Sequence, residues 1–211
     1  MLGVTGAVGA GKSTVCAALA GHGFAVLDVD VVASEVLAAG VPEVAALLPA
    51  LGPTPSGAAV LRAILERPAL RPRVEAAARP YVEARLRAWK AALTTDGVLE
   101  AALLFEVGLD ALCDATWCVT CPAEVRRLRV GARATTSARS FDAIEAAQWP
   151  EAEKARRADD VVDGAAEGAP LEARVREALG RLRARPGWAP DGPVSPGLPQ
   201  PATGRRTDGV P

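Results

Sequence analysis

Residues 6–13 carry the clearest chemical signal in the sequence. They read GAVGAGKS and match the pattern G-x-x-x-x-G-K-[ST] at every defined position. In such a loop, glycines let backbone N–H groups approach a phosphate. The lysine, here Lys12, reaches the β- and γ-phosphates, and the hydroxyl of Ser13 binds Mg²⁺. A chance glycine-rich turn is the alternative, but the position of the loop between an apolar run and a helical pattern favours binding of ATP or GTP.

Two aspartates follow the next apolar run, FAVLDVD. If Asp28 and Asp30 end a second strand, their spacing of two places both side chains on one face, at the sheet edge where ligands bind. A carboxylate there can accept a proton from an attacking hydroxyl or position Mg²⁺. The alternative is that Asp30 is the N-cap of the helix expected over VVASEVLAA. The residues alone leave both roles open.

Glutamates occur in the third apolar run, GVLEAALLFE. Glu100 lies near the end of an expected third strand, where an acidic side chain can hold Mg²⁺ through water. For Glu106, a place at the start of a solvent-facing helix is the simpler interpretation.

An arginine-rich helix is expected after residue 122. Arg129 and Arg133 are four positions apart and share one face of it, and guanidinium groups suit phosphate oxygens. The pattern indicates either a lid that clamps phosphate or a solvated helix face that also includes Arg126 and Arg127.

Cys118 and Cys121 have C-x-x-C spacing but lie along an expected buried strand without a second pair, so we predict core thiols and no zinc site. His22 stands in a Gly-His-Gly turn without a ligand cluster, and we assign it no role. Trp89 lies in an amphipathic helical pattern and is expected to pack.

Short apolar strands alternating with helices must position these groups. We expect strands within residues 1–5, 24–30, 97–104, 115–121 and 159–163, with helical patterns between them. This order predicts an α/β fold: a P-loop NTPase-like parallel five-stranded sheet flanked by helices. We expect one domain over residues 1–185, with an all-helical insertion at 31–95, and a disordered Pro/Gly-rich tail at 186–211.

Composition excludes several classes of protein. The 211 residues carry a formal net charge of -1, which gives no basic field for nucleic acid or an anionic membrane. The sequence shows neither a membrane-spanning run nor a signal peptide, and its four cysteines do not resemble a secreted disulfide framework. We therefore expect a cytoplasmic protein without nucleic-acid or membrane partners, as a monomer or weak homo-oligomer.

Taken together, these motifs resemble the dephospho-coenzyme A kinase family from Met1 to about Arg183. The family pattern T-G-x-x-G-x-G-K-S-T, D-x-D, L-L-F-E, C-P-x-E with R-x-x-x-R, and A-D-D-V-I-D stands here as TGAVGAGKST, DVD, ALLFE, CPAEV with Arg129 and Arg133, and ADDVVD. The resemblance implies that ATP, with Mg²⁺, phosphorylates the ribose 3′-hydroxyl of dephospho-CoA, the last step of coenzyme A biosynthesis.

The resemblance also implies roles for individual residues. Asp30 would be the catalytic base, acting with Lys12, while Ser13 and Glu100 would hold the metal. Residues 31–95 would bind the substrate and residues 122–158 would contain the lid. The implied nucleotide-binding residues are Gly9, Ala10, Gly11, Lys12, Ser13, Thr14, Arg129 and Arg133.

Some positions depart from the family pattern. Ser34 replaces an arginine and Arg79 replaces a histidine, both in the region expected to meet dephospho-CoA; Ala102, Ala134 and Gly164 replace proline, aspartate and asparagine. Loss of a charged phosphate contact costs about 1.5 to 3 kcal/mol, which predicts weaker acceptor binding unless Arg79 or another arginine substitutes. The first strand is also short, which suggests an upstream start codon.

Other functions stay open at this point. One is a different small-molecule or nucleotide P-loop kinase, or a catalytically weak homologue. Another is a nucleotide-binding switch without an acceptor, although the sequence has no N-K-x-D guanine signature.

Overall fold

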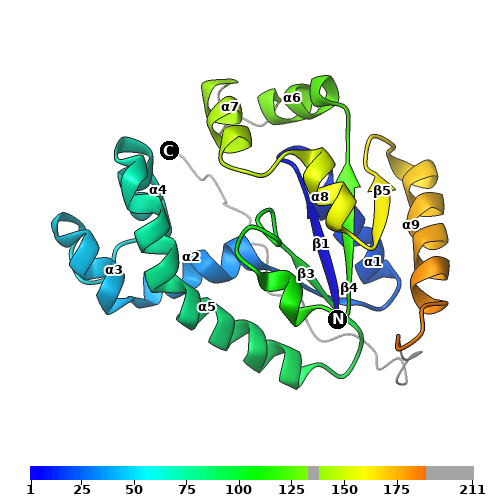
Figure 1. The fold of residues 1–211 in the computed structure, drawn as a ribbon, viewed down its shortest axis with the longest axis horizontal. Coiled ribbons are helices and arrows are strands. Elements are labelled where there is room, and N and C mark those ends of the chain that lie inside the picture. Colours follow the sequence, from blue (N-terminus) through cyan, green and yellow to red (C-terminus); the bar gives the residue numbers. More distant parts are fainter. Residues whose placement is uncertain (133–137, 189–211) are drawn as a thin grey trace, which may run out of the picture.

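The computed structural model describes residues 1–132 and 138–188, and its centre is a five-stranded parallel sheet (Figure 1). The strand order is β2-β3-β1-β4-β5, so the first strand lies in the middle. The α/β class and all five predicted strands are confirmed. The strands are β1 (Leu2–Gly6), β2 (Ala25–Asp28), β3 (Gly97–Glu100), β4 (Ala115–Thr120) and β5 (Asp160–Asp163).

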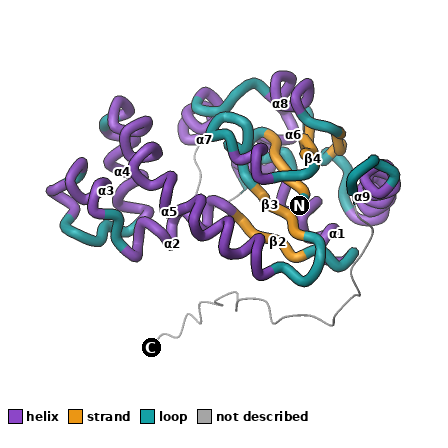
Figure 2. The backbone as a smooth tube through the Cα atoms, turned by 60° about the horizontal axis from the view of Figure 1, so that its bottom comes forward, coloured by secondary structure: helices purple, strands orange, loops and turns teal. Residues whose placement is uncertain are grey.

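The central strands are apolar on both faces because helices cover the sheet from both sides. Every residue of β1 and β3 is buried. Val98 faces a core formed with α1 (Lys12–Gly21) and α9 (Gly168–Arg183), whereas its neighbour Leu99 packs in a second core on the opposite face. In Figure 2, α1 and α8 (Glu151–Arg157) lie on opposite sides of the strands.

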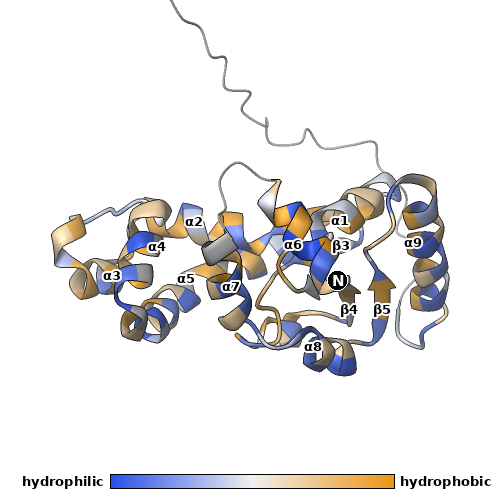
Figure 3. Ribbon diagram, turned by 90° about the horizontal axis from the view of Figure 1, so that it is seen from above, coloured by the Kyte–Doolittle hydropathy of each residue, from blue (hydrophilic) through white to orange (hydrophobic). Residues whose placement is uncertain are grey.

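Helices fill the chain between β2 and β3, and those farthest from the sheet form one end of the molecule (Figures 1 and 3). Their mutual contacts bury an apolar core that includes Val36, Val44, Val60 and Leu86. Hydrophobic and hydrophilic residues alternate around α5 and α9 in Figure 3, as in other helices that bury one face. The helices of this region are α2 (Val29–Ala39), α3 (Pro42–Leu47), α4 (Gly57–Glu66) and α5 (Arg71–Ala92), with short 3₁₀ turns at Pro49–Leu51 and Pro68–Leu70.

Two further helices, α6 (Ala123–Gly131) and α7 (Ala138–Ala146), follow β4, and a 3₁₀ turn at Leu109–Leu112 precedes that strand. The expected tail begins at residue 186, but Trp188 is only 9% exposed and packs in the core beside α9, so the packed chain reaches Trp188. Residues 189–211 lie outside the described part. None of the described helices has the length and apolar character needed to cross a membrane.

Candidate active site

The loop between β1 and α1 has the backbone conformation that its glycines permit. Gly6, Gly9 and Gly11 have φ angles of 151°, 78° and 99°, a range that other residues rarely adopt. A Cβ atom on Gly6 would lie 2.3 Å from the carbonyl oxygen of Val119, so the loop also needs glycine for its close contact with β4. Helix α1 begins at Lys12, so the N-terminus of the helix faces this loop.

Lys12 folds back over the loop. Its Nζ donates hydrogen bonds to the carbonyl oxygens of Gly6, at 3.1 Å, and Ala7, at 3.3 Å. Burial lowers the pKa of the ammonium, and the carboxylates of Glu100 and Asp30 oppose this shift. The charge of Lys12 therefore lies at the carboxyl ends of the strands, where the phosphates of a nucleotide would bind.

Ser13 and Glu100 are brought together from two elements. The Ser13 hydroxyl donates to Oε1 of Glu100 at 2.6 Å, and Glu100, the last residue of β3, is 8% exposed. A hydroxyl and a carboxylate oxygen are the kind of ligands that Mg²⁺ takes alongside phosphate oxygens and water. The residues present fit this ion. Thr14 is exposed, and its backbone N–H donates to Gly11.

The two aspartates do not share a strand face, so that prediction is wrong. Strand β2 ends at Asp28, which is the N-cap of α2: its Oδ1 accepts from the backbone N–H groups of Asp30 at 2.8 Å and Val31 at 3.3 Å. The helix starts two residues earlier than expected because Asp28, and not Asp30, satisfies its free N–H groups. Asp30 lies in the first helical turn, and its carboxylate does not cap the helix.

An apolar cavity of about 310 Å³ opens beside Asp30. Residues from α2, α4, α5 and the segment after β3 line it, mostly aliphatic ones such as Val60, Ile64 and Leu103. Desolvation by the surrounding protein raises the pKa of the Asp30 carboxyl, Asp28 and Glu100 add to the increase, and Lys12 opposes it. The cavity thus joins an apolar wall to a carboxyl group whose pKa suits proton acceptance better than that of an ordinary aspartate.

The positions that depart from the family pattern lie in the same area. Arg79 lines the apolar cavity and is the only cation among the described lining residues. Ser34 packs against the start of α4, since a Cβ atom on Gly57 would lie 2.6 Å from its hydroxyl oxygen. The glycine at position 164 has a steric explanation, because a Cβ atom there would lie 2.1 Å from the carbonyl oxygen of Ala10. Ala134 falls outside the described residues.

The arginines of α6 have different surroundings. Arg129 donates to the carbonyl oxygens of Gly164, at 2.8 Å, and Ala165, at 3.3 Å, close to Gly11 of the loop. Arg126 is only 6% exposed, so the expectation of a solvated face is wrong for it. Arg133 falls outside the described residues.

One buried ion pair was missed at the sequence level. Lys154, on α8 and fully buried, lies 2.8 Å from Oε1 of Glu106 and also bonds the carbonyl oxygen of Ala102. Glu106 is therefore not on a solvent-facing helix, and the interpretation given above is wrong. The sequence around Lys154, EAEKARR, reads as a solvated helix and gave no signal of this burial.

The cysteines and the histidine have structural surroundings. Cys118 and Cys121 are buried free thiols, as predicted, and burial raises the pKa of Cys118 to about 12. A thiol with such a pKa stays protonated and packs as an apolar side chain.

Nε2 of His22 lies 2.7 Å from Glu172 of α9. Trp89 packs against the core of the helical region.

The family model and the curated relatives agree on one family. A family model described as dephospho-CoA kinase matches residues 1–169. A dephospho-CoA kinase of Synechococcus sp. (strain JA-3-3Ab) is 35% identical over 210 residues, covering 85% of this chain and 91% of the relative. The crystal structure of TT1252 from Thermus thermophilus superposes with a TM-score of 0.75 at 34% identity, covering 85% and 95% of the two chains. A dephospho-CoA kinase from Campylobacter jejuni shares the fold, with a TM-score of 0.62 at 18% identity over 86% and 96% of the chains.

Proposed function

Because the chain belongs to the dephospho-CoA kinase family, we propose that it transfers the γ-phosphoryl group of ATP to the ribose 3′-hydroxyl of dephospho-CoA. The products are ADP and coenzyme A. The observation that carries the proposal is the convergence of the phosphate-binding loop, the Asp30 carboxyl and the apolar cavity at the carboxyl edge of one sheet.

In the proposed reaction, the acceptor oxygen forms a bond to the γ-phosphorus while the bond from that phosphorus to the β,γ-bridging oxygen breaks. Asp30 takes the proton of the hydroxyl, and the charge left on the bridging oxygen goes with ADP. Lys12 and the loop N–H groups hold the transferring phosphates, so positioning and charge neutralisation supply most of the catalysis.

Ser13 and Glu100 would hold Mg²⁺, which when bound neutralises phosphate charge. The 2.6 Å contact between their oxygens supports this assignment. Arg129 and Arg133 would act on the phosphates from the lid side, and the place of Arg129 next to Gly11 supports the first of these two roles.

The proposal is tested by measuring ADP release from the purified chain with ATP and Mg²⁺, with and without dephospho-CoA. We expect ADP formation only with the acceptor, and a product heavier than dephospho-CoA by one phosphoryl group in the mass spectrum. ADP release that ignores dephospho-CoA, or that follows another hydroxyl compound instead, would reject dephospho-CoA as the acceptor.

A further inference from the structure

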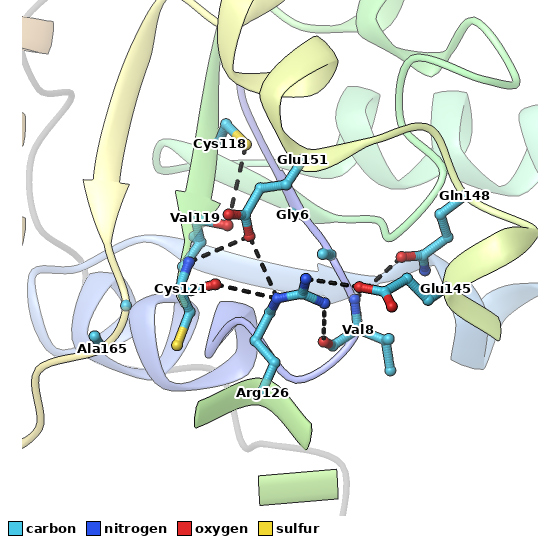
Figure 4. A network of polar contacts seen from close by, with 12 residues as sticks. Gly6, Val8, Cys118, Val119, Cys121, Arg126, Glu145, Gln148, Glu151 and Ala165 are labelled. Carbon is cyan, nitrogen blue, oxygen red and sulfur yellow. Dashed lines mark hydrogen bonds and ion pairs between the residues drawn. The ribbon is translucent and has the colours of Figure 1, made fainter. Parts of the chain in front are cut away.

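Both backbone polar groups of Val8, inside the phosphate-binding loop, are bound by side chains from the C-terminal half of the chain (Figure 4). The Val8 N–H donates to Oε1 of Gln148 at 3.1 Å, and the Val8 carbonyl oxygen accepts from Nη1 of Arg126 at 3.4 Å. Arg126 lies on α6, and Gln148 follows α7. The loop is thus bonded to α6 and to the turn after α7, both within the segment expected to contain the lid.

Arg126 is itself held in one orientation. Its Nη2 lies 2.6 Å from Oε1 of Glu145, and its Nε donates to the carbonyl oxygen of Cys121 at 3.1 Å and lies 3.8 Å from Oε2 of Glu151. Glu151 also accepts from the backbone N–H of Cys121 at 3.2 Å. A buried guanidinium with its charge balanced in this way is fixed by its partners. It would have to break these contacts to reach a phosphate.

The loop needs such support because a glycine-rich backbone loses much conformational entropy when it becomes ordered. Gly9 follows Val8 and Gly6 precedes it by two positions, and glycine loses more backbone freedom on ordering than any other residue. A Cβ atom on Gly9 would lie 2.8 Å from the carbonyl oxygen of Arg126, so α6 also touches the loop directly. A loop that is ordered before the ligand arrives binds it more tightly, because the ordering cost is met during folding.

We propose that Gln148 and Arg126 are positioning residues that hold the phosphate-binding loop in its nucleotide-binding conformation. Neither needs to touch the nucleotide, since both act through Val8. The inference rests on the proposed function, in which this loop receives ATP, and it predicts a selective effect on nucleotide binding over acceptor binding.

The main test is Gln148→Met, which keeps the side-chain length but removes the acceptor for the Val8 N–H. Loss of one hydrogen bond of this kind predicts an ADP dissociation constant raised about three- to tenfold in titration calorimetry. The KM for ATP should rise by a similar factor, and the KM for dephospho-CoA should stay within about twofold of wild type. Hydrogen exchange of the Val8 amide should become faster.

Thr116→Val provides the matched control. It removes two hydrogen bonds between the Thr116 hydroxyl and Asp159, of 2.9 Å and 3.2 Å, near the start of β4 and away from the phosphate-binding loop. This variant should lower the unfolding temperature without changing the ADP dissociation constant. An unchanged ADP dissociation constant in Gln148→Met, or an equal rise in both KM values, would overturn the positioning role.

Arg126→Lys provides a second test, because lysine keeps the positive charge but cannot make all the contacts of the Arg126 guanidinium group. If it folds, its ADP affinity should also fall, again with the acceptor KM preserved. The two proposals fail in distinguishable ways. Wild-type protein that binds no ADP, or transfers nothing to dephospho-CoA, counts against the proposed function. Normal wild-type activity with an unaffected Gln148→Met counts against the positioning role alone.

Discussion

The phosphate-binding loop and the apolar cavity are built in different ways although they meet at one sheet edge. The loop is eight consecutive residues whose glycines fix its conformation and whose helix, α1, directs N–H groups at a phosphate. The cavity is assembled from residues between Val29 and Leu109 on three helices and one connecting segment. Its walls are largely aliphatic, with few charged groups among them.

This difference separates general from specific recognition. Any nucleoside triphosphate offers the loop the same phosphates, so a short motif is sufficient. An acceptor is distinguished by its shape and by a few polar contacts, here Asp30 and Arg79, which can change while the apolar walls remain. Four predictions test whether the two regions divide the work in this way.

The largest effect is expected from Lys12→Ala, on the side of the phosphate-binding loop. It removes the positive charge that Nζ would place beside the β- and γ-phosphates, and we expect phosphoryl transfer to fall about a thousandfold or more. Binding of dephospho-CoA alone, measured by calorimetry, should be retained because the apolar cavity is intact. If Lys12→Ala kept wild-type turnover in the ADP-release assay, the loop would have no part in the mechanism.

Asp30→Asn should have the next largest effect, at the border between the two regions. Asparagine has the same shape but cannot accept the proton, and a placed base contributes about a hundredfold to ten-thousandfold. We expect kcat to fall by about a hundredfold or more while the KM for dephospho-CoA changes little. A loss below about fivefold with unchanged acceptor affinity would show that Asp30 is not the base.

The same division explains what could be predicted from the sequence. The loop, the five strands and the closeness of Ser13 and Glu100 to one sheet edge follow from local patterns and parallel topology. That Asp28 and not Asp30 caps α2 could not be predicted, because a strand end and a helix start compete for the same three residues.

Long-range polar contacts were the least predictable part. Lys154 and Glu106 are 48 positions apart by number and meet only in the folded chain, as do Gln148 and Val8. Lys154 lies in EAEKARR, a stretch whose composition is typical of a solvent-exposed helix. A local pattern contains no information on the partner that makes burial of such a group possible.

Arg79→Ala tests the acceptor side. Arg79 is the only cation among the described residues that line the apolar cavity, and it has no hydrogen-bond or ion-pair partner in the described chain that would compete for it. We expect the KM for dephospho-CoA to rise about tenfold, at the lower end for a charged phosphate contact because the residue is exposed. The KM for ATP should not change.

The matched control for this substitution is Arg73→Ala, which removes an exposed arginine of the same helix that does not line the cavity. Its acceptor KM should equal that of wild type. Equal effects of the two substitutions would mean that Arg79 acts only through the general charge of α5.

The smallest expected effect concerns stability at the border between the regions. The pKa of Asp30 in the folded chain is raised above the ordinary value of 3.8, so the folded state binds this proton more tightly than the unfolded state. Ionised Asp30 therefore lowers the free energy of unfolding above its folded pKa, and this penalty disappears as the pH falls towards 3.8. Asp30→Asn should then be more stable than wild type at pH 7, by only about 0.5 kcal/mol because solvent reaches the Asp30 side chain and screens its charge.

Urea unfolding of wild type and Asp30→Asn between about pH 4 and 7 measures this difference. It should shrink steadily towards the acid end of the range. Lys12 lowers the pKa of Asp30, so the stabilisation by Asp30→Asn should be larger when Lys12 is replaced by Met. A variant that is no more stable than wild type at pH 7, or a gain that ignores Lys12, would mean that the two regions are not coupled electrostatically through this pair.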